Sequence, residues 1–173
     1  MLPSPLRRMI PAFFFDRDGT VNISPGAGYV LGWADFHFQP GVREMLHAVK
    51  TRGFLAILIT SQQGVGKGLM TQETLDEIHG RMQAALGACA FDDILACTGL
   101  EGIDPRRKPS PAMIMEAAER HQIDLAASWN VGDSERDVEM GRRAGVGHNL
   151  HFGSAEFPDW EAIRSHWLSR GTP

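Results

Sequence analysis

Short apolar runs that alternate with amphipathic segments are the feature of this chain that most restricts its fold. The clearest runs occupy residues 12–15 and 54–60, and we predict further strands at 92–98, 128–133 and 146–152. Between them, apolar residues recur at helical spacing, as in the segment that opens at Pro40-Gly41 and stops at Gly53. Short strands without polar alternation are typical of a sheet that is buried on both faces, with helices as its crossovers. We therefore predict an α/β fold, a Rossmann-like doubly wound parallel sheet.

The length of the chain and its lack of internal boundaries indicate one domain. A chain of 173 residues can bury a core of ordinary size, and no repeat or linker divides it. We predict a single domain over residues 1–173, with a catalytic core at about 11–150 and a C-terminal helix at about 158–170. No segment is left for a second domain.

Charge and cysteine content restrict the setting in which the protein works. The formal net charge of -4 gives no support for a nucleic-acid or membrane surface that acts through bulk charge. Cys89 and Cys97 are too few for a disulfide framework. The opening "MLPSPLRRMIPAFFF" has no long apolar stretch before a small-residue cleavage site. We expect a cytoplasmic protein without a membrane span, either a monomer or a weak homo-oligomer.

Carboxylates and hydroxyls gather where the predicted strands end. These residues are Asp16 and Asp18 after the first strand, Thr60 and Ser61 after the second, and Asp133 after the fourth. Open α/β sheets bind ligands at this edge, where the strand order reverses. Carboxylates brought together there repel one another unless a cation lies between them, and Mg²⁺ suits oxygen ligands. Asp137, one helical turn after Asp133, points to the same place.

Basic residues near the same edge indicate that the ligand is a phosphate. Arg107 and Lys108 lie in the loop after the third strand, and Lys67 follows a glycine-rich turn. Together with the hydroxyl and backbone N–H of Thr60, these groups would surround a phosphate with donors.

The first two acids then have distinct chemical tasks. Aspartate is able to attack phosphorus and form an aspartyl-phosphate, which we predict for Asp16. Asp18, two residues on, lies on the same side of an extended chain and would act as the acid and base.

These motifs together resemble those of the haloacid dehalogenase (HAD) superfamily of phosphohydrolases. The matching stretches are "DRDGT" with Asp16 and Asp18, "LIT" with Thr60, "RKP" with Lys108, and "GDSERD" with Asp133 and Asp137. The resemblance covers roughly residues 11–150. It implies a Rossmann-like core, Mg²⁺ bound by the four aspartates, and hydrolysis of a phosphomonoester by way of an aspartyl-phosphate.

A narrower resemblance is to the branch of this superfamily that contains heptose-bisphosphate and histidinol-phosphate phosphatases. It rests on "FFFDRDGTVN", "GYV", "FQPGV", "TSQQGVGKG" and "IDLAASWNVGD". The branch implies a small phosphorylated metabolite as substrate, first a sugar bisphosphate of carbohydrate metabolism and alternatively histidinol phosphate. The branch implies no large cap domain, which agrees with the single domain predicted here, so specificity would come from the loops at residues 24–35, 62–70 and 98–107. Lys67 and Arg107 lie in the second and third of these loops, and Ser61 directly precedes the second.

The chain departs from that branch at two points near the expected pocket. Typical members hold zinc through several Cys and His residues, but the loop "CTGLEGIDPRRKP" offers Cys97 alone, so we expect no zinc site. Ser61 replaces the usual Asn of the turn, so a contact to the nucleophile or phosphate would be lost or bridged by water. Both changes leave the chemistry intact and the substrate open.

Other functions are compatible with parts of the pattern. A polynucleotide 3′-phosphatase predicts a basic groove and stacking aromatics, which the net charge and the single Tyr do not favour. A phosphoacceptor of the receiver type would not need the acid and base that Asp18 provides. "SQQGVGKG" fails as a nucleotide P-loop because Gly68 stands where Ser or Thr must follow the lysine. For Arg17, both a structural pairing with a nearby acid and a contact with the ligand remain open.

Overall fold

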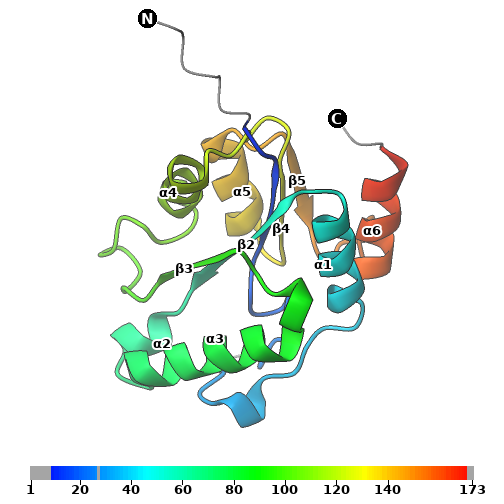
Figure 1. The fold of residues 1–173 in the computed structure, drawn as a ribbon. Helices are drawn as coiled ribbons and strands as arrows, with labels where there is room; N and C mark the ends of the chain where they lie inside the picture. Colours follow the sequence, from blue (N-terminus) through cyan, green and yellow to red (C-terminus); the bar gives the residue numbers. More distant parts are fainter. Residues whose placement is uncertain (1–8, 27, 171–173) are drawn as a thin grey trace, which may run out of the picture.

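All strands of the structure run parallel in one sheet. The computed structural model describes residues 9–26 and 28–170. Within them the sheet has five strands in the order β3-β2-β1-β4-β5, flanked by helices (Figure 1). The strands are β1 (Ala12–Phe15), β2 (Leu55–Ser61), β3 (Asp93–Cys97), β4 (Trp129–Gly132) and β5 (His148–His151). The helices are α1 (Val42–Thr51), α2 (Gln63–Gly66), α3 (Gln72–Leu86), α4 (Ala112–His121), α5 (Glu135–Ala144) and α6 (Trp160–Ser169). The prediction of a doubly wound parallel sheet is confirmed.

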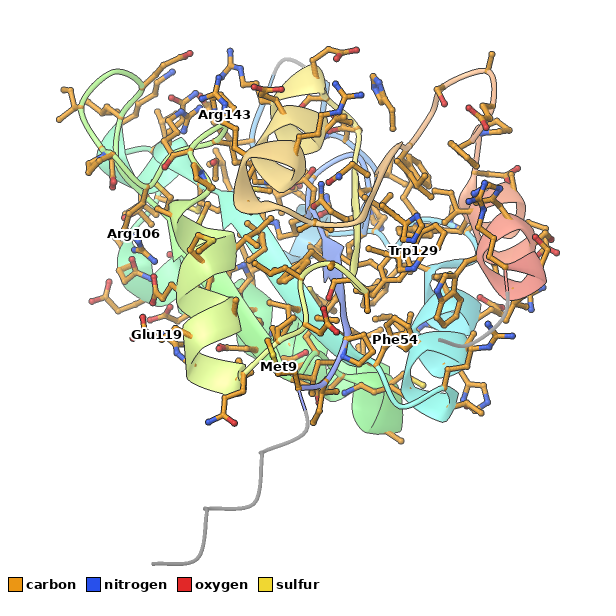
Figure 2. The ribbon with its side chains drawn as sticks, turned by 90° about the horizontal axis from the view of Figure 1, so that it is seen from above. Met9, Phe54, Arg106, Glu119, Trp129 and Arg143 are labelled. Carbon is orange, nitrogen blue, oxygen red and sulfur yellow. The ribbon has the colours of Figure 1, made fainter. Side chains whose placement is uncertain are left out.

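Aromatic side chains dominate the core on one face of the sheet, beneath α1, α3 and α6. Phe13 and Phe15 of β1 point to this face, and Phe13 packs edge-on against Trp167 of α6 with ring centroids 5.7 Å apart. Phe54 contacts the same tryptophan at 5.3 Å, and Figure 2 shows Phe54 and Trp129 on the side of α1 and α6. Burying each such ring contributes on the order of 1.5–3 kcal/mol. The C-terminal helix α6 is therefore anchored to the sheet through its buried tryptophans.

The opposite face of the sheet packs against α4 and α5, which lie on the other side of the strands in Figure 1. Phe14, between the two phenylalanines of the first core, points to this face together with Ile57 and Ile59 of β2. Successive strand residues alternate between faces, so a strand with apolar neighbours on both sides needs apolar residues at every position. The unbroken apolar runs of the sequence have this cause.

The order of the strands makes a crevice at the carboxyl end of β1. From β1 the chain passes through α1 to β2 on one side of it, and later returns through α4 to β4 on its other side. The connections therefore leave β1 and β4 toward opposite faces, which is the arrangement that opens a ligand site in α/β sheets. The residues that follow β1 and β4 are Asp16 and Asp133.

Local sequence signals set the ends of several helices. The Thr71 hydroxyl accepts the N–H of Thr74 and caps α3, and Gly145, with φ 83°, ends α5. Pro111 is the N-cap of α4. The loop predicted at residues 62–70 contains the short helix α2. No helix within residues 9–26 and 28–170 has the length and apolar character needed to cross a membrane.

Candidate active site

A cavity of about 340 Å³ opens at the carboxyl ends of β1, β2 and β4. It is lined by Asp16, Asp18, Ser61, Arg107, Lys108, Asp133, Ser134, Arg136 and Asp137. Most of the residues predicted from the sequence thus meet in one place, although they come from four separate stretches of the chain. Two do not line it: Thr60 is buried at the end of β2, and Lys67 hydrogen-bonds the Tyr29 hydroxyl at 3.0 Å.

The turn after β1 places the first two acids at this cavity. Asp16 still belongs to the sheet, because its N–H donates to the carbonyl of Val131 in β4 at 3.0 Å. The chain then turns around the Arg17 carbonyl and passes through Gly19, whose φ of 84° favours glycine. A Cβ on Gly19 would lie 1.8 Å from an Asp133 carboxylate oxygen. Glycine is therefore needed here both for the turn and for the approach of Asp133.

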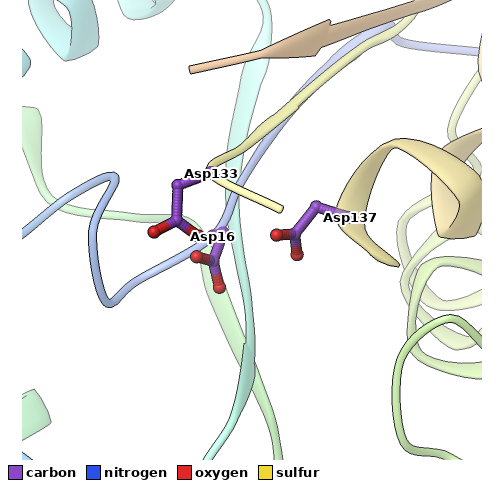
Figure 3. Close-up of side chains that lie close together, drawn as sticks. All are labelled: Asp16, Asp133 and Asp137. Atoms are coloured by element: carbon purple, nitrogen blue, oxygen red, sulfur yellow. The ribbon is translucent and has the colours of Figure 1, made fainter. Parts of the chain in front are cut away.

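Three carboxylates converge in the cavity. Asp16, Asp133 and Asp137 each offer an oxygen within 4.8 Å of the others, and Figure 3 shows the carboxyl groups directed toward one another. Across the described parts of the chain, no other group of three or more His, Cys, Asp or Glu side chains comes so close. Asp18 lines the same cavity, but its carboxylate lies outside this cluster and accepts a hydrogen bond from Arg17 at 3.0 Å.

Lys108 lies between two of the three acids. Its Nζ donates to Asp16 Oδ1 at 2.6 Å and to Asp137 Oδ1 at 2.7 Å. Burial alone would lower the pKa of Lys108, but the carboxylates of Asp137 and Asp16 outweigh it and raise that pKa. The second oxygen of Asp137 accepts from the N–H and hydroxyl of Ser134 in a capping box at the start of α5. Both oxygens of Asp137 are therefore engaged by the protein itself.

The cluster holds more negative than positive charge. Burial, followed by repulsion from Asp137, raises the pKa of Asp16 from 3.8 to about 8 despite the contact with Lys108. Burial and Asp137 also raise the pKa of Asp133. One lysine thus faces three carboxylates, and the charged forms of Asp16 and Asp133 are disfavoured. Such a site, made of carboxylate oxygens and open to water on one side, fits a hard divalent cation such as Mg²⁺.

This electrostatic imbalance predicts how stability depends on pH without metal. A carboxyl with pKa 3.8 when unfolded and about 8 when folded stabilises the fold at low pH, and this contribution disappears as pH rises toward 8. His79, whose pKa burial and Arg17 lower from 6.5 to about 4, opposes this trend only below 6.5. Between pH 6.5 and about 8, wild-type protein should lose about 1–2 kcal/mol more unfolding free energy than Asp16→Asn. Urea unfolding in a metal chelator measures both; parallel curves would contradict the prediction.

Donors without partners face the same cavity. The hydroxyl of Ser61 and the Nε and Nη1 atoms of Arg107 are buried and have no hydrogen-bond partner among the described residues. Buried polar groups in proteins are nearly always hydrogen-bonded, so such donors at a cavity indicate a place for a ligand. Thr60 has a different partner, since its hydroxyl accepts the side-chain amide of Gln62 at 2.8 Å.

Two residues of the site, Arg136 and Ser134, were not found by sequence reasoning. Arg136 lines the cavity and pairs with Glu101 across its rim at 3.2 Å. The one sequence feature that points to Arg136 is its position directly before Asp137. Because a single charged residue on a helix is usually solvated, this position alone does not identify it as a site residue. Ser134 was detectable, because Ser followed three residues later by an acid predicts a reciprocal helix cap.

The loop after β3 is organised around a carboxylate. Asp104 accepts the N–H of Arg106 at 2.8 Å, and it also contacts the thiol of Cys97, whose pKa burial raises. A Cβ on Gly99 would lie 2.2 Å from the Asp104 side chain, so the loop closes tightly around it. Cys97 itself is buried at the end of β3. In the part of the chain that the structure describes, it belongs to no group of three metal-ligating side chains.

Comparisons with known proteins place these features in a family. A model of HAD-hydrolase-like proteins matches residues 105–150. D-glycero-beta-D-manno-heptose-1,7-bisphosphate 7-phosphatase of Helicobacter pylori (strain J99) is 38% identical over 143 residues, which cover 80% of this chain and 81% of that protein. D-glycero-alpha-D-manno-heptose-1,7-bisphosphate 7-phosphatase of Burkholderia mallei is 35% identical over 149 residues, 80% of this chain and 78% of that one.

Solved structures agree with the sequence relatives. The D,D-heptose 1,7-bisphosphate phosphatase of B. bronchiseptica, complexed with magnesium and phosphate, superposes with a TM-score of 0.83 at 28% identity. The match covers 94% of this chain and all of that one. The similarity thus extends over the whole sheet and the helices around it.

Proposed function

Because this chain belongs to the HAD superfamily, in the family of the D-glycero-D-manno-heptose-1,7-bisphosphate 7-phosphatases, we propose that it removes the 7-phosphate of such a heptose bisphosphate. The proposal is carried by the similarity to these enzymes over about four fifths of both chains. It is supported by the cavity, which joins an aspartate at a strand end, a buried lysine and unpartnered donors. The chain is a phosphoric monoester hydrolase.

In the proposed reaction, an oxygen of Asp16 attacks the phosphorus and the bond to the sugar oxygen breaks. Asp18 gives its proton to that leaving oxygen, and the product is an aspartyl-phosphate. A water molecule then attacks phosphorus while Asp18 takes back a proton, which releases phosphate and restores Asp16. Lys108, 2.6 Å from Asp16, balances negative charge as it accumulates on the transferred group.

We propose that Asp16 and Asp133 hold the Mg²⁺ ion. Mg²⁺ usually takes one or two carboxylates and completes its shell with water and phosphate oxygens. Asp137 belongs to the predicted ligand set, but Lys108 and Ser134 occupy its oxygens, so its main task is to position Lys108. Asp18 stays a predicted ligand whose carboxylate would first have to leave Arg17. When bound, Mg²⁺ neutralises charge on the phosphate and lowers the barrier to attack.

The second phosphate of the substrate is proposed to bind Arg107 and Arg136. Both arginines line the cavity, and Arg107 has two nitrogen donors without partners among the described residues. Guanidinium groups recognise phosphate oxygens through paired, charge-assisted hydrogen bonds. Histidinol phosphate carries a positive amine in place of a second phosphate, so these arginines favour the bisphosphate.

Replacing Arg107 by Met should weaken the binding of a bisphosphate specifically. Losing a charged hydrogen bond of about 1.5–3 kcal/mol predicts a KM raised by about 10- to 100-fold for the heptose bisphosphate. The KM for p-nitrophenyl phosphate, which has one phosphate, should change less than about threefold. Arg106→Met is the matched control, because Arg106 lies in the same loop but pairs with Glu116 on α4. Equal changes for both substrates would contradict a role in binding the second phosphate.

Phosphate release from a set of candidate substrates tests the proposed function. The set contains both anomers of D-glycero-D-manno-heptose 1,7-bisphosphate, histidinol phosphate and a DNA 3′-phosphate, each with Mg²⁺. We expect the highest kcat/KM with one heptose anomer, and ³¹P NMR should show that the phosphate at position 7 disappears. Release from DNA ends without activity on either anomer would overturn the proposal.

A further inference from the structure

Arg17 lies fully buried beside the cavity, between the two acids of the "DRDGT" motif. Its Nη2 donates to both oxygens of Asp18, at 3.0 and 3.1 Å, and its Nε donates to Oδ1 at 3.2 Å. The side chain of Arg17 has no exposed area, whereas that of Asp18 is 32% exposed and lines the cavity. The arginine thus contacts Asp18 from the protein side and leaves one edge of the carboxylate open to the cavity.

The other end of the guanidinium contacts a histidine from a distant part of the chain. Arg17 Nη1 lies 3.2 Å from Nε2 of His79, a buried residue of α3. Arginine remains charged in proteins and has only donors, so Nε2 must accept and the ring proton must sit on Nδ1. Burial and the charge of Arg17 lower the pKa of His79 to about 4, which agrees with a neutral ring. In this contact, His79 therefore acts only as a hydrogen-bond acceptor.

We propose that His79, acting through Arg17, is a positioning residue that holds the Asp18 carboxyl in place for proton transfer. The inference rests on the proposed phosphatase function and on the role assigned to Asp18. Asn22 and Gln62 also donate to Asp18, at 3.1 and 2.7 Å. Arg17 differs from them because its fork fixes the plane of the carboxylate, and His79 in turn fixes the plane of the fork.

Loss of the acceptor at position 79 would disturb this arrangement. With Leu in place of His79, the Nη1 group of Arg17 would be buried without a partner, and the guanidinium would turn toward another acceptor. The carboxylate would follow, and a displacement of about 1 Å is enough to slow proton transfer by about 100-fold. The loss of activity should be larger for substrates whose leaving oxygen must be protonated than for substrates whose leaving group departs as an anion.

The test compares His79→Leu and His79→Gln on substrates with different leaving groups. An alkyl phosphate needs protonation of its leaving oxygen, whereas p-nitrophenyl phosphate leaves without it. We expect His79→Leu to lower kcat/KM for a simple alkyl phosphate and for the heptose bisphosphate by about 10- to 100-fold. The value for p-nitrophenyl phosphate should fall less than about threefold. His79→Gln, whose amide oxygen can accept from Arg17, should restore most of the loss.

The outcomes separate positioning from folding and from substrate identity. An equal loss on both kinds of substrate, or no loss on either, would overturn the proposal. If His79→Leu does not fold, Arg17→Lys, which keeps the charge but removes the fork, must show the same dependence on leaving group. The alkyl and aryl phosphates probe Asp18 even if heptose bisphosphate is not the natural substrate. Absence of all phosphatase activity in wild type would instead refute the proposed function.

Discussion

Replacing Asp16 by Asn should reduce phosphate release by on the order of 10⁴-fold or more, because an amide cannot form the phosphorylated intermediate. The variant should nonetheless fold and be more stable than wild type at about pH 8 without metal. That gain follows from the removal of a buried carboxyl that burial and Asp137 hold at a pKa of about 8. Initial rates with Mg²⁺ measure the first effect, and thermal unfolding in a chelator measures the second.

The two effects together identify the nucleophile more firmly than inactivity alone. A variant that is merely damaged loses activity and stability at once, whereas a functional residue in a strained site loses activity and gains stability. Asp76→Asn is a suitable control, because Asp76 lies on the exposed face of α3 and accepts a hydrogen bond from Gln72 on the same helix. It should leave both quantities unchanged. Retention of wild-type activity by Asp16→Asn would contradict the mechanism.

The fold could be predicted from the sequence because the three central strands, β1, β2 and β4, are buried on both faces. That condition produces apolar runs such as Phe13 to Phe15, with one polar residue where the strand leaves the core. Since parallel strands end at the same edge, the positions of Asp16 and Asp133 followed from the order of elements alone. These parts of the site depend on local pattern and topology, and both can be derived from a linear chain.

The partners of the charged residues could not be predicted in the same way. The sequence predicts four acids at one edge of the sheet. Nothing in it indicates that Lys108 binds Asp16 and Asp137, while Asp133 forms no ion pair within the described residues. The contact between Arg17 and His79 joins residues 62 positions apart, and a lone histidine on a helix carries no recognisable pattern. Such choices depend on which side chains meet after packing, where distances of a few tenths of an ångström decide the hydrogen bond.

Replacing Lys108 by Met should produce the second large effect, on activity and on stability together. Lys108 is the cation that contacts Asp16 and Asp137 inside the protein, and its side chain is 6% exposed. Removing one partner of a buried ion pair destabilises a protein by about 3–5 kcal/mol, because the remaining charge has no compensation. Hydrolysis should fall by on the order of 10³-fold, since the transferred phosphoryl group loses a neighbouring positive charge. Urea unfolding and initial rates, each with and without Mg²⁺, measure these changes.

Mg²⁺ should stabilise Lys108→Met more than it stabilises wild type, because three carboxylates then face the metal without a competing cation. Lys50→Met is the matched control. Lys50 pairs with Asp92 where both side chains are partly exposed, at 26% and 30%, so its loss should cost less than about 1 kcal/mol and leave the Mg²⁺ effect unchanged. If Mg²⁺ stabilised Lys108→Met and wild type equally, the lysine and the metal would not share their carboxylates. The proposal that Asp16 contacts both Lys108 and Mg²⁺ would then be wrong, and so would the balance of charge proposed for this site.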